Sequence, residues 1–440
     1  MTDPNASHHR HMTLWGVVAL GVGSMVGAGV FALLGQIAVN VRGDTWIVFV
    51  LAGIAALFSA YSYARLSAKF PSRGGVTDFF ALGMGSPRIE RALACLYLIT
   101  LVLTLALVSK AFGAYAARVV HQPEHSDWAN IYATGVLIVL TLVNLMGSKT
   151  IGRVEVFLVA IKLAILALFI GVGAMTLKPA MLEVHADVAP SLMFSSIGLA
   201  FFAYSGFGMM ASAAADVPQP EKTMPRAFML AVSLVMVLYV VLALVVLGNV
   251  TPSDLVAYSD TAVAQAAAPI LGDWGFLLVS LAALFATASS IVANIFSMLN
   301  VSKQMGNNGT LPQVFRTQAI AGGTRGFYSL IAVIIVLTNF FDLSSIANVA
   351  SATFLACYIA VFIVCWRRRK DCHANPLIIA MGFLVMSGIF VTFIGEMIAE
   401  KLWLQCITLA GAALLSLLIG WRSPNSSDNQ QTDSHHSGQQ

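Results

Sequence analysis

Apolar residues follow one another along almost the whole chain in stretches of about 20, the length at which a helix spans the hydrocarbon core of a bilayer. Polar segments separate these stretches. Because unpaired backbone amides and carbonyls are costly in lipid, each stretch is expected to be a helix. The twelve predicted spans are approximately 14–39, 45–64, 92–120, 129–147, 153–177, 191–214, 226–249, 275–301, 327–342, 346–366, 374–395 and 401–421. The pattern predicts an all-α integral membrane protein.

Composition agrees with this pattern, because 58% of the 440 residues are hydrophobic and only 10% are charged. A soluble core does not need that much apolar surface. We therefore expect a single transmembrane domain at 14–421, preceded by a cytoplasmic segment at 1–13. The polar segment 422–440 has too little apolar surface to fold, so it is expected to be a disordered cytoplasmic tail.

The distribution of positive charge predicts the orientation of the chain. Of the 24 Lys and Arg residues, 18 lie in connections on the side of the N-terminus. The four on the other side are Arg42, Arg118, Lys178 and Lys401. Because cytoplasmic loops carry the excess of Lys and Arg, both termini are expected on the cytoplasmic side of a plasma or inner membrane. The net charge of +4 then reflects topology, and no nucleic-acid partner is expected. The oligomeric state stays open.

Nothing in the sequence indicates an enzyme. A membrane enzyme would need clustered metal-ligating histidines or a nucleophile beside its base, yet all nine histidines fall outside the predicted spans. The cysteines are Cys95, Cys357, Cys365, Cys372 and Cys406. They lack the paired spacing of a disulfide framework or a zinc site. We expect no catalytic residue, no metal and no cofactor, and the histidines of the two termini, which could hold a metal weakly, are expected to be solvated.

The first span departs from an ordinary lipid-facing helix at GVGSMVGAGVF, Gly21 to Phe31, which holds four glycines in nine residues. Each glycine costs about 1 kcal/mol relative to alanine inside a helix. One interpretation is close packing of small residues against a neighbouring helix. The other is an unwound segment, Ser24 to Gly29, whose free amides and carbonyls line a water-filled site. The first span alone does not decide between them.

The sixth span is also interrupted, by Ser205, Gly206 and Gly208. It enters the predicted bilayer from the side opposite to the first span. Two glycine-interrupted helices at corresponding places of two oppositely oriented five-helix halves are typical of an inverted-repeat transporter with a midplane site. The expected division is repeat 1 at about 14–177, repeat 2 at about 191–366 and two accessory helices at about 374–421.

These motifs resemble the amino acid–polyamine–organocation (APC) superfamily, whose members share the LeuT-like fold. The resemblance extends from Leu14 to about Leu418. Its most specific motifs are GSMVGAGVF in the first span, KFPSRGG after the second, FFAYSGFG in the sixth and the DVPQPEKTMPRA loop that follows. Within the superfamily the chain is most similar to the ApcT-like, proton-coupled amino-acid transporters, in AYSYARLSAKF, ALVSKAFGAY and GRVEVFLVAIKLAIL.

The resemblance implies secondary active uptake of neutral L-amino acids by alternating access, with a proton as the coupling ion. Gly208 stands where many members that handle cationic substrates have a glutamate, which disfavours guanidinium and polyamine substrates. Two alternatives remain: an amine or polyamine exchanger of the same fold, and a solute sensor that does not transport.

The resemblance also assigns a substrate site to the two interrupted spans. Amides at the N-terminal end of the outer half of the first span would bind the substrate carboxylate, because that end is partially positive. Carbonyls of the sixth span would accept from the α-ammonium, and Phe202 and Tyr204 would form an aromatic wall or outer gate. The expected substrate-binding residues are Ser24, Met25, Val26, Gly27, Ala28, Gly29, Phe202, Ala203, Tyr204, Ser205 and Gly206.

Lys162 is the candidate for proton coupling. At 1.5 Å per residue it lies about 13 Å into the fifth span, and a charge that deep costs at least ~2.5–3.5 kcal/mol and is functional by default. A buried lysine can gain and lose a proton near neutrality. The resemblance implies that its ammonium replaces a sodium ion and bonds the Gly23 carbonyl and the Ser289 hydroxyl, with Thr287 or Ser290 as alternatives to Ser289.

Lys110 also falls in an apolar span, but about 27 Å from its start. That places it near the outer interface, where a lysine can extend its ammonium to water. No transport role is expected for Lys110, and Asp342 is expected to be solvated at the same boundary.

Overall fold

The computed structural model describes residues 12–145, 148–182, 188–319 and 322–421. Most of the predicted N-terminal segment and the whole predicted tail therefore lie outside the described residues. Helices dominate the described part, which contains no strand and only an isolated bridge between Gln318 and Thr324.

The long helices coincide with the predicted spans. They are α1 (Leu14–Met25) with α2 (Ala28–Val41), α3 (Thr45–Lys69), α5 (Pro87–Val119), α6 (Asp127–Leu145), α7 (Ser148–Gly173), α8 (Pro190–Tyr204) with η3 (Ser205–Asp216), α9 (Pro220–Leu247), α12 (Ala268–Asn307), α13 (Arg325–Phe340), α14 (Leu343–Arg367), α15 (Pro376–Ala399) and α16 (Trp403–Trp421). The short helices are η1 (Arg42–Asp44), α4 (Val76–Gly83), η2 (Pro179–Leu182), α10 (Pro252–Ala257), η4 (Ser259–Thr261), α11 (Ala262–Gln265) and η5 (Gln313–Phe315).

Within the described residues, nine helical segments are long and apolar enough to cross a membrane, judged by length and composition. Three shorter apolar helices, Leu14–Met25, Val159–Gly173 and Arg325–Phe340, fall in other predicted spans. The all-α membrane fold is confirmed. The count of twelve spans and the 5+5 repeat stay predictions.

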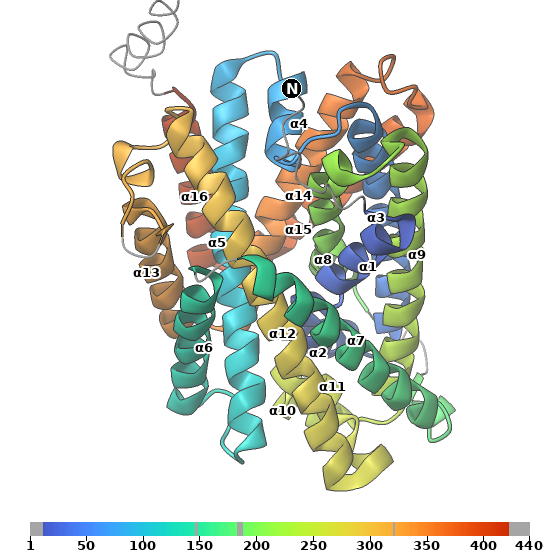
Figure 1. Ribbon diagram of the computed structural model, residues 1–440. Coiled ribbons are helices and arrows are strands. Elements are labelled where there is room, and N and C mark those ends of the chain that lie inside the picture. Colours follow the sequence, from blue (N-terminus) through green and yellow to red (C-terminus); the bar gives the residue numbers. More distant parts are fainter. Residues whose placement is uncertain (1–11, 146–147, 183–187, 320–321, 422–440) are drawn as a thin grey trace, which may run out of the picture.

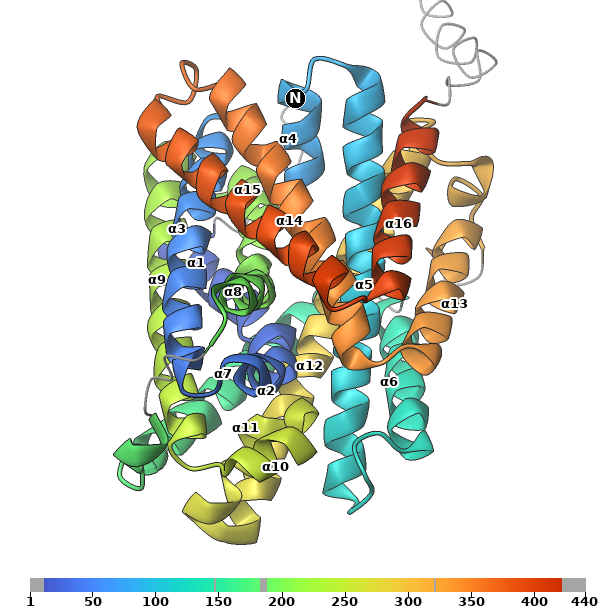
Figure 2. The ribbon, with the colours of Figure 1, turned by 180° about the vertical axis from the view of Figure 1, so that it is seen from behind.

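The two broken spans lie inside the bundle. Figures 1 and 2 show α1, α2 and α8 in the interior, with α3 and α9 side by side on one flank and α5 on the other. In the apolar 18-residue stretch of α5, 72% of the residues are buried, whereas in that of α16 only 17% are buried. The α5 helix is therefore a central support, and α16 presents most of its surface to lipid.

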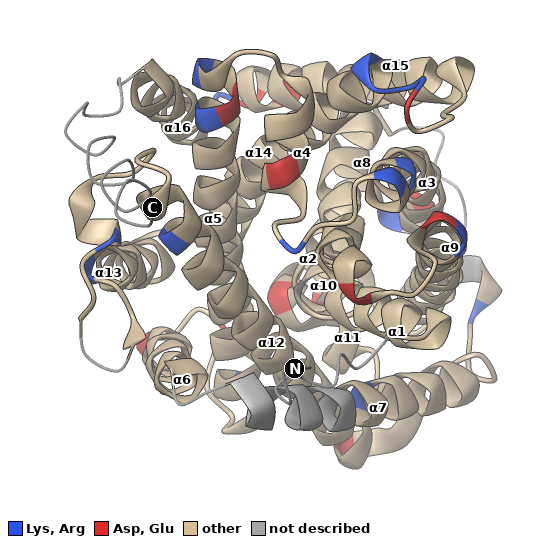
Figure 3. Cartoon of the chain, turned by 45° about the horizontal axis from the view of Figure 1, so that its top comes forward, with Lys and Arg blue, Asp and Glu red and all other residues tan. Residues whose placement is uncertain are grey.

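The C-terminal end of α16 lies at one end of the bundle, together with α4 (Figures 1 and 2). We call this the terminal end. At the opposite end, called the α10 end, lie α10, α11 and η4. Figure 3 brings the terminal end forward and shows the charged residues near helix ends and connections, while the helix shafts are largely uncharged.

Candidate substrate and coupling site

The first broken span opens between α1 and α2. Val26 (φ −79°, ψ 54°) and Gly27 (φ −122°, ψ −99°) both leave the helical region, and α2 begins at Ala28. Gly27 supplies no side-chain cap. The first amides of α2 consequently lack partners within the helix, and such a helix N-terminus in the protein interior is suited to bind an anion.

The sixth span breaks differently from the expected unwound segment. Its α-helix ends at Tyr204, and the chain continues without a gap as the 12-residue 3₁₀-helix η3. Runs of 3₁₀-helix longer than three or four residues are uncommon because their hydrogen-bond geometry is poorer, and they often mark a hinge. The sixth span therefore changes its helical pitch at the site instead of unwinding.

The two breaks lie in direct contact. A Cβ added to Gly206 would lie 2.6 Å from the Ser24 carbonyl, and a Cβ on Gly29 would overlap the backbone of Ala203. Only glycine permits such an approach of two backbones. The glycines of the first span thus serve both purposes that the sequence left open, since they break the helix and pack it closely.

A cavity lies at this contact. It is lined by Ser24, Met25, Gly29, Tyr63, Val76, Tyr97, Leu101, Thr104, Phe202, Ala203, Ser205, Gly206, Gly208, Met209, Ser290, Asn294, Phe354 and Tyr358. Seven of the eleven predicted substrate residues belong to this lining. The lining also includes Val76 of α4 and Met209 of η3, so the cavity extends from the breaks toward the terminal end.

Two predicted residues of the first break, Val26 and Gly27, are not part of the cavity lining among the described residues. The amide of Val26 cannot serve a ligand, because it donates to the Val22 carbonyl at 2.8 Å and so completes the last turn of α1. Gly27 faces α12, where an added Cβ would lie 3.0 Å from Cβ of Ser290. The backbone of Ala28 begins α2, and its side chain lies outside the described part of the structure.

The predicted aromatic wall consists of Phe202 without Tyr204. Phe202 lines the cavity and meets Phe354 edge to face, with ring centroids 5.3 Å apart. Tyr204 is buried away from the cavity, and its hydroxyl donates to the Phe49 carbonyl of α3 at 2.8 Å. Consecutive positions of a helix project about 100° apart, so Phe202 and Tyr204 lie on different sides of α8. The gating role of Tyr204 stays a prediction.

Two tyrosines that the sequence analysis did not single out hold the breaks together. The hydroxyl of Tyr239, on α9, lies 2.5 Å from the Met25 carbonyl and 3.2 Å from the Ala203 carbonyl. The hydroxyl of Tyr358, on α14, donates to the Ser205 carbonyl at 2.6 Å. Interrupted helices leave carbonyls unpaired, and buried ones need partners. These hydroxyls supply them.

Lys162 lies within α7 and is 1% exposed. Its Nζ donates to the Gly23 carbonyl of α1 at 2.8 Å, one turn before the first break. Ser289 is buried on α12, and its contact with the ammonium stays a prediction. The geometry joins α7 to the inner half of the first span at a charged group, while the coupling role of Lys162 itself stays a prediction.

Lys110 has polar partners on two neighbouring helices, and its expected place at the outer interface stays a prediction. It is half-buried, and its ammonium donates to Oδ1 of Asn130 at 3.2 Å and to the Thr338 carbonyl at 3.0 Å. It therefore ties α5 to α6 and α13. Asp342 is exposed and caps α14, where its carboxylate accepts from the amide of Ser345 at 2.9 Å.

An ion pair fastens the terminal end of the site. Arg73, in the KFPSRGG loop, lies 2.6 Å from Asp216 at the end of η3, with the side chains 67% and 33% exposed. The amide of Met12 also donates to the Asp216 carbonyl, at 2.9 Å. These contacts connect the end of the sixth span to the loop after the second span and to the start of the first. The ion pair is largely exposed and thus weak.

Comparison with known proteins decides what kind of protein carries this site. The amino acid permease family model matches residues 12–412. The chain belongs to the amino acid permease family. It is 44% identical to the inner membrane transport protein YbaT of Escherichia coli, over 95% of this chain and 97% of YbaT.

Two further relatives are more distant. The permease is 33% identical to the uncharacterised protein MJ0609 of Methanocaldococcus jannaschii, over 87% of this chain and 88% of that protein. It is 23% identical to the branched-chain amino acid permease BcaP of Bacillus subtilis, over 95% and 94% of the two chains. The permease is thus a multi-pass membrane transporter, not an enzyme, and its family implies amino acids as substrates.

Proposed function

We propose that the permease takes up neutral L-amino acids by alternating access and that uptake is driven by protons through Lys162. The observation that carries the substrate assignment is the chemistry of the cavity. Among the described residues that line it, none is Asp, Glu, Lys, Arg or His. A cationic side chain buried there would lack a carboxylate partner, which is costly.

Gly208 supports this assignment from inside the cavity. It belongs to the lining, and a Cβ at this position would lie 3.1 Å from the Tyr358 hydroxyl. Gly208 therefore places no charge where a glutamate would contact a cationic substrate, and the group nearest to it is the neutral hydroxyl of Tyr358. A substrate whose own charges are limited to its carboxylate and α-ammonium fits this surface.

Backbone groups would hold those two charges. The N-terminal amides of α2, near Gly29, would bind the carboxylate. The Ala203 carbonyl accepts one hydroxyl, from Tyr239, and its second lone pair would accept from the α-ammonium. Recognition through backbone groups leaves the rest of the cavity to the substrate side chain.

The coupling proposal rests on the contact between Lys162 and Gly23 and on the resemblance to ApcT-like transporters. A protonated ammonium makes a charge-assisted hydrogen bond to the Gly23 carbonyl, and deprotonation weakens that bond. A proton can bias the position of the first span only through such a difference in contacts between two states. In this proposal the terminal end faces the cytoplasm, as the distribution of Lys and Arg predicts.

The substrate class can be tested by uptake into proteoliposomes under an inward proton gradient. We expect saturable uptake of leucine or alanine that agmatine and putrescine do not inhibit. Saturable agmatine uptake without competition from alanine, serine or leucine would replace this proposal with the amine exchanger. Ligand binding without any uptake in either direction would favour the sensor.

The variant Gly208→Glu tests the same substrate assignment by changing the cavity instead of the substrate. Its carboxylate would enter the cavity without a cationic partner, so leucine uptake should fall severely and the binding of agmatine should become detectable. Gly208→Ala is the control, because its methyl group meets the hydroxyl end of Tyr358 and, at the ordinary contact distance of 3.6 Å, the ring of Tyr63, and should leave leucine uptake largely intact. Equal leucine uptake by both variants would show that Gly208 does not face the substrate.

A further inference from the structure

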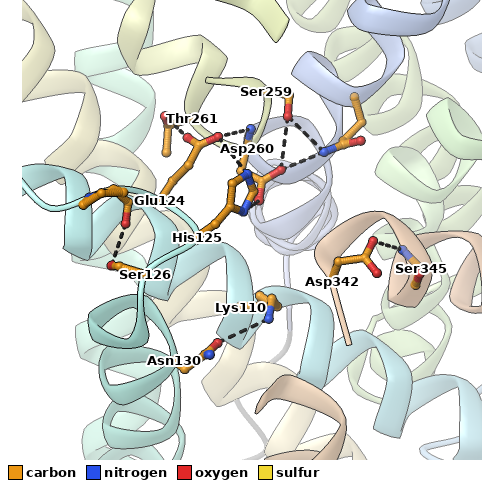
Figure 4. A network of polar contacts seen from close by, with 12 residues as sticks. Lys110, Glu124, His125, Ser126, Asn130, Ser259, Asp260, Thr261, Asp342 and Ser345 are labelled. Atoms are coloured by element: carbon orange, nitrogen blue, oxygen red, sulfur yellow. Dashed lines mark hydrogen bonds and ion pairs between the residues drawn. The ribbon is translucent and has the colours of Figure 1, made fainter. Parts of the chain in front are cut away.

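Three potential metal ligands converge at the α10 end, outside the site described above. Glu124 and His125 lie in the connection between α5 and α6, and Asp260 lies in η4 (Figure 4). Glu124 is 5% exposed and Asp260 is 2% exposed, whereas His125 is exposed to solvent. The two carboxylates are thus buried, and the imidazole lies between them and the solvent.

The distances suit a small cation better than a set of hydrogen bonds. Oε1 of Glu124 lies 3.6 Å from Nε2 of His125, and Oδ2 of Asp260 lies 3.7 Å from Nδ1. One ligand atom from each residue lies within 4.8 Å of the other two. Zinc bonds of about 2.0–2.2 Å place tetrahedral ligand atoms about 3.4 Å apart. The imidazole is the exposed member of the set and is therefore the side chain with room to adjust toward that spacing.

Donors orient both carboxylates, and Oε1 of Glu124, which faces His125, accepts a long hydrogen bond from the Asp260 amide at 3.4 Å. Oε2 of Glu124 accepts from the Thr261 hydroxyl at 2.6 Å, and Oδ1 of Asp260 accepts from the Gln36 amide at 2.7 Å. Within the described part of the chain, Oδ2 of Asp260 accepts no hydrogen bond although the residue is 98% buried. Donors that orient one oxygen while the other points at the site are typical of metal-binding carboxylates.

The local charge also favours a cation. Burial raises the pKa of both Glu124 and Asp260, because the loss of surrounding water disfavours the charged carboxylate, and at Glu124 the nearby Asp260 adds to this effect. The ammonium of Lys110 acts on Asp260 only at a distance, since it is bonded to Asn130 and Thr338. A divalent ion would neutralise both carboxylates directly.

We propose that Glu124, His125 and Asp260 bind a divalent transition-metal ion of the zinc class, with water as the fourth ligand. One imidazole nitrogen and two carboxylate oxygens form a ligand set that zinc accepts, and hard cations such as magnesium prefer oxygen alone. The exposed side of His125 supplies the route of entry.

The ion would hold the α10 end closed. It would join the α5–α6 connection to η4, and η4 is seated on α2, the outer half of the first broken span. Besides the bond from Gln36 to Asp260, the Ser259 carbonyl approaches Gly35 so closely that an added Cβ would overlap it. If α2 must leave η4 or carry it away to open the site, a bound ion opposes the movement and slows transport.

Isothermal titration of purified full-length protein with zinc chloride tests the binding. Because His8, His9, His11, His435 and His436 could also bind zinc, all variants are made in a background in which these five are glutamine. In that background we expect one zinc ion per chain and a loss of at least about tenfold in affinity in His125→Ala. His121→Ala, which removes another exposed histidine of the same connection, is the matched control and should bind as its parent does.

Equal zinc affinity in His125→Ala and His121→Ala would overturn the site, as would the absence of binding in the parent. This readout does not depend on the proposed function. Zinc should then slow substrate uptake in the parent and in His121→Ala, and slow it much less in His125→Ala. Zinc binding that leaves uptake unchanged would overturn the closing role, and equal inhibition of all three would place the inhibition elsewhere.

Discussion

Two lysines lie inside apolar spans of this permease, and they differ in what their ammonium groups hold. Lys162 is 1% exposed and bonds the Gly23 carbonyl just before the break of the first span. Lys110 is half-buried and bonds Asn130 and Thr338 on two uninterrupted helices. A position inside an apolar span is common to both lysines. In the proposed function they differ because the partner of Lys162 belongs to a broken span, whereas the partners of Lys110 do not.

The largest effect is expected from removing the charge of Lys162. Lys162→Met keeps the length and volume of the stem but loses the ammonium, so Gly23 loses a charged donor. We expect uptake driven by a proton gradient to fall to background in proteoliposomes, while exchange of labelled for unlabelled substrate survives. Proton-driven accumulation at the wild-type rate would contradict the assigned role.

A smaller effect is expected from Tyr239→Phe. This variant tests whether the two breaks need the hydroxyl that bonds their freed carbonyls. The substitution removes the hydroxyl shared by the Met25 and Ala203 carbonyls, and leaving buried carbonyls unpaired costs about 1–3 kcal/mol. Substrate affinity should weaken by about tenfold, the equivalent of 1.4 kcal/mol, with the proton dependence retained. Tyr204→Phe removes a hydroxyl bonded to α3 instead and serves as the control. A larger loss of affinity in Tyr204→Phe would contradict the assignment.

The smallest effect on transport is expected from Lys110→Met. The ammonium ties α5 to α6 and α13, so its loss should lower the temperature of thermal unfolding. Proton-driven uptake, measured per folded protein, should stay close to that of the wild type. Loss of the pH-gradient dependence in this variant would erase the distinction between the two lysines.

The sequence predicted the fold and the places where two spans are interrupted because both depend on local composition. Apolar stretches must be helices in lipid, and clustered glycines mark the places where two spans are interrupted. The close contact between the breaks was not predictable from a single span. Gly206 touches Ser24, 182 positions earlier in the chain, and only the folded arrangement shows that each glycine accommodates the backbone of the other break.

The parts that escaped prediction depend on pairs of residues distant in sequence. Tyr239 and Tyr358 are single tyrosines in apolar runs, where packing is the ordinary role, and their hydroxyls acquire a purpose only beside freed carbonyls. Tyr204 was assigned to the cavity because it neighbours Phe202, but it projects to another side of the helix. Glu124 and Asp260 are 136 positions apart, so no spacing motif connects them.

The central claim is that Lys162, and not Lys110, links substrate binding to a proton. The most direct measurement is substrate affinity as a function of pH, by equilibrium binding to purified wild type, Lys162→Met and Lys110→Met. Because linkage is reciprocal, affinity should rise as pH falls in the wild type and in Lys110→Met, by up to about tenfold per pH unit for one coupled proton. It should be flat in Lys162→Met. A pH dependence that persists in Lys162→Met, or disappears in Lys110→Met, would contradict the account.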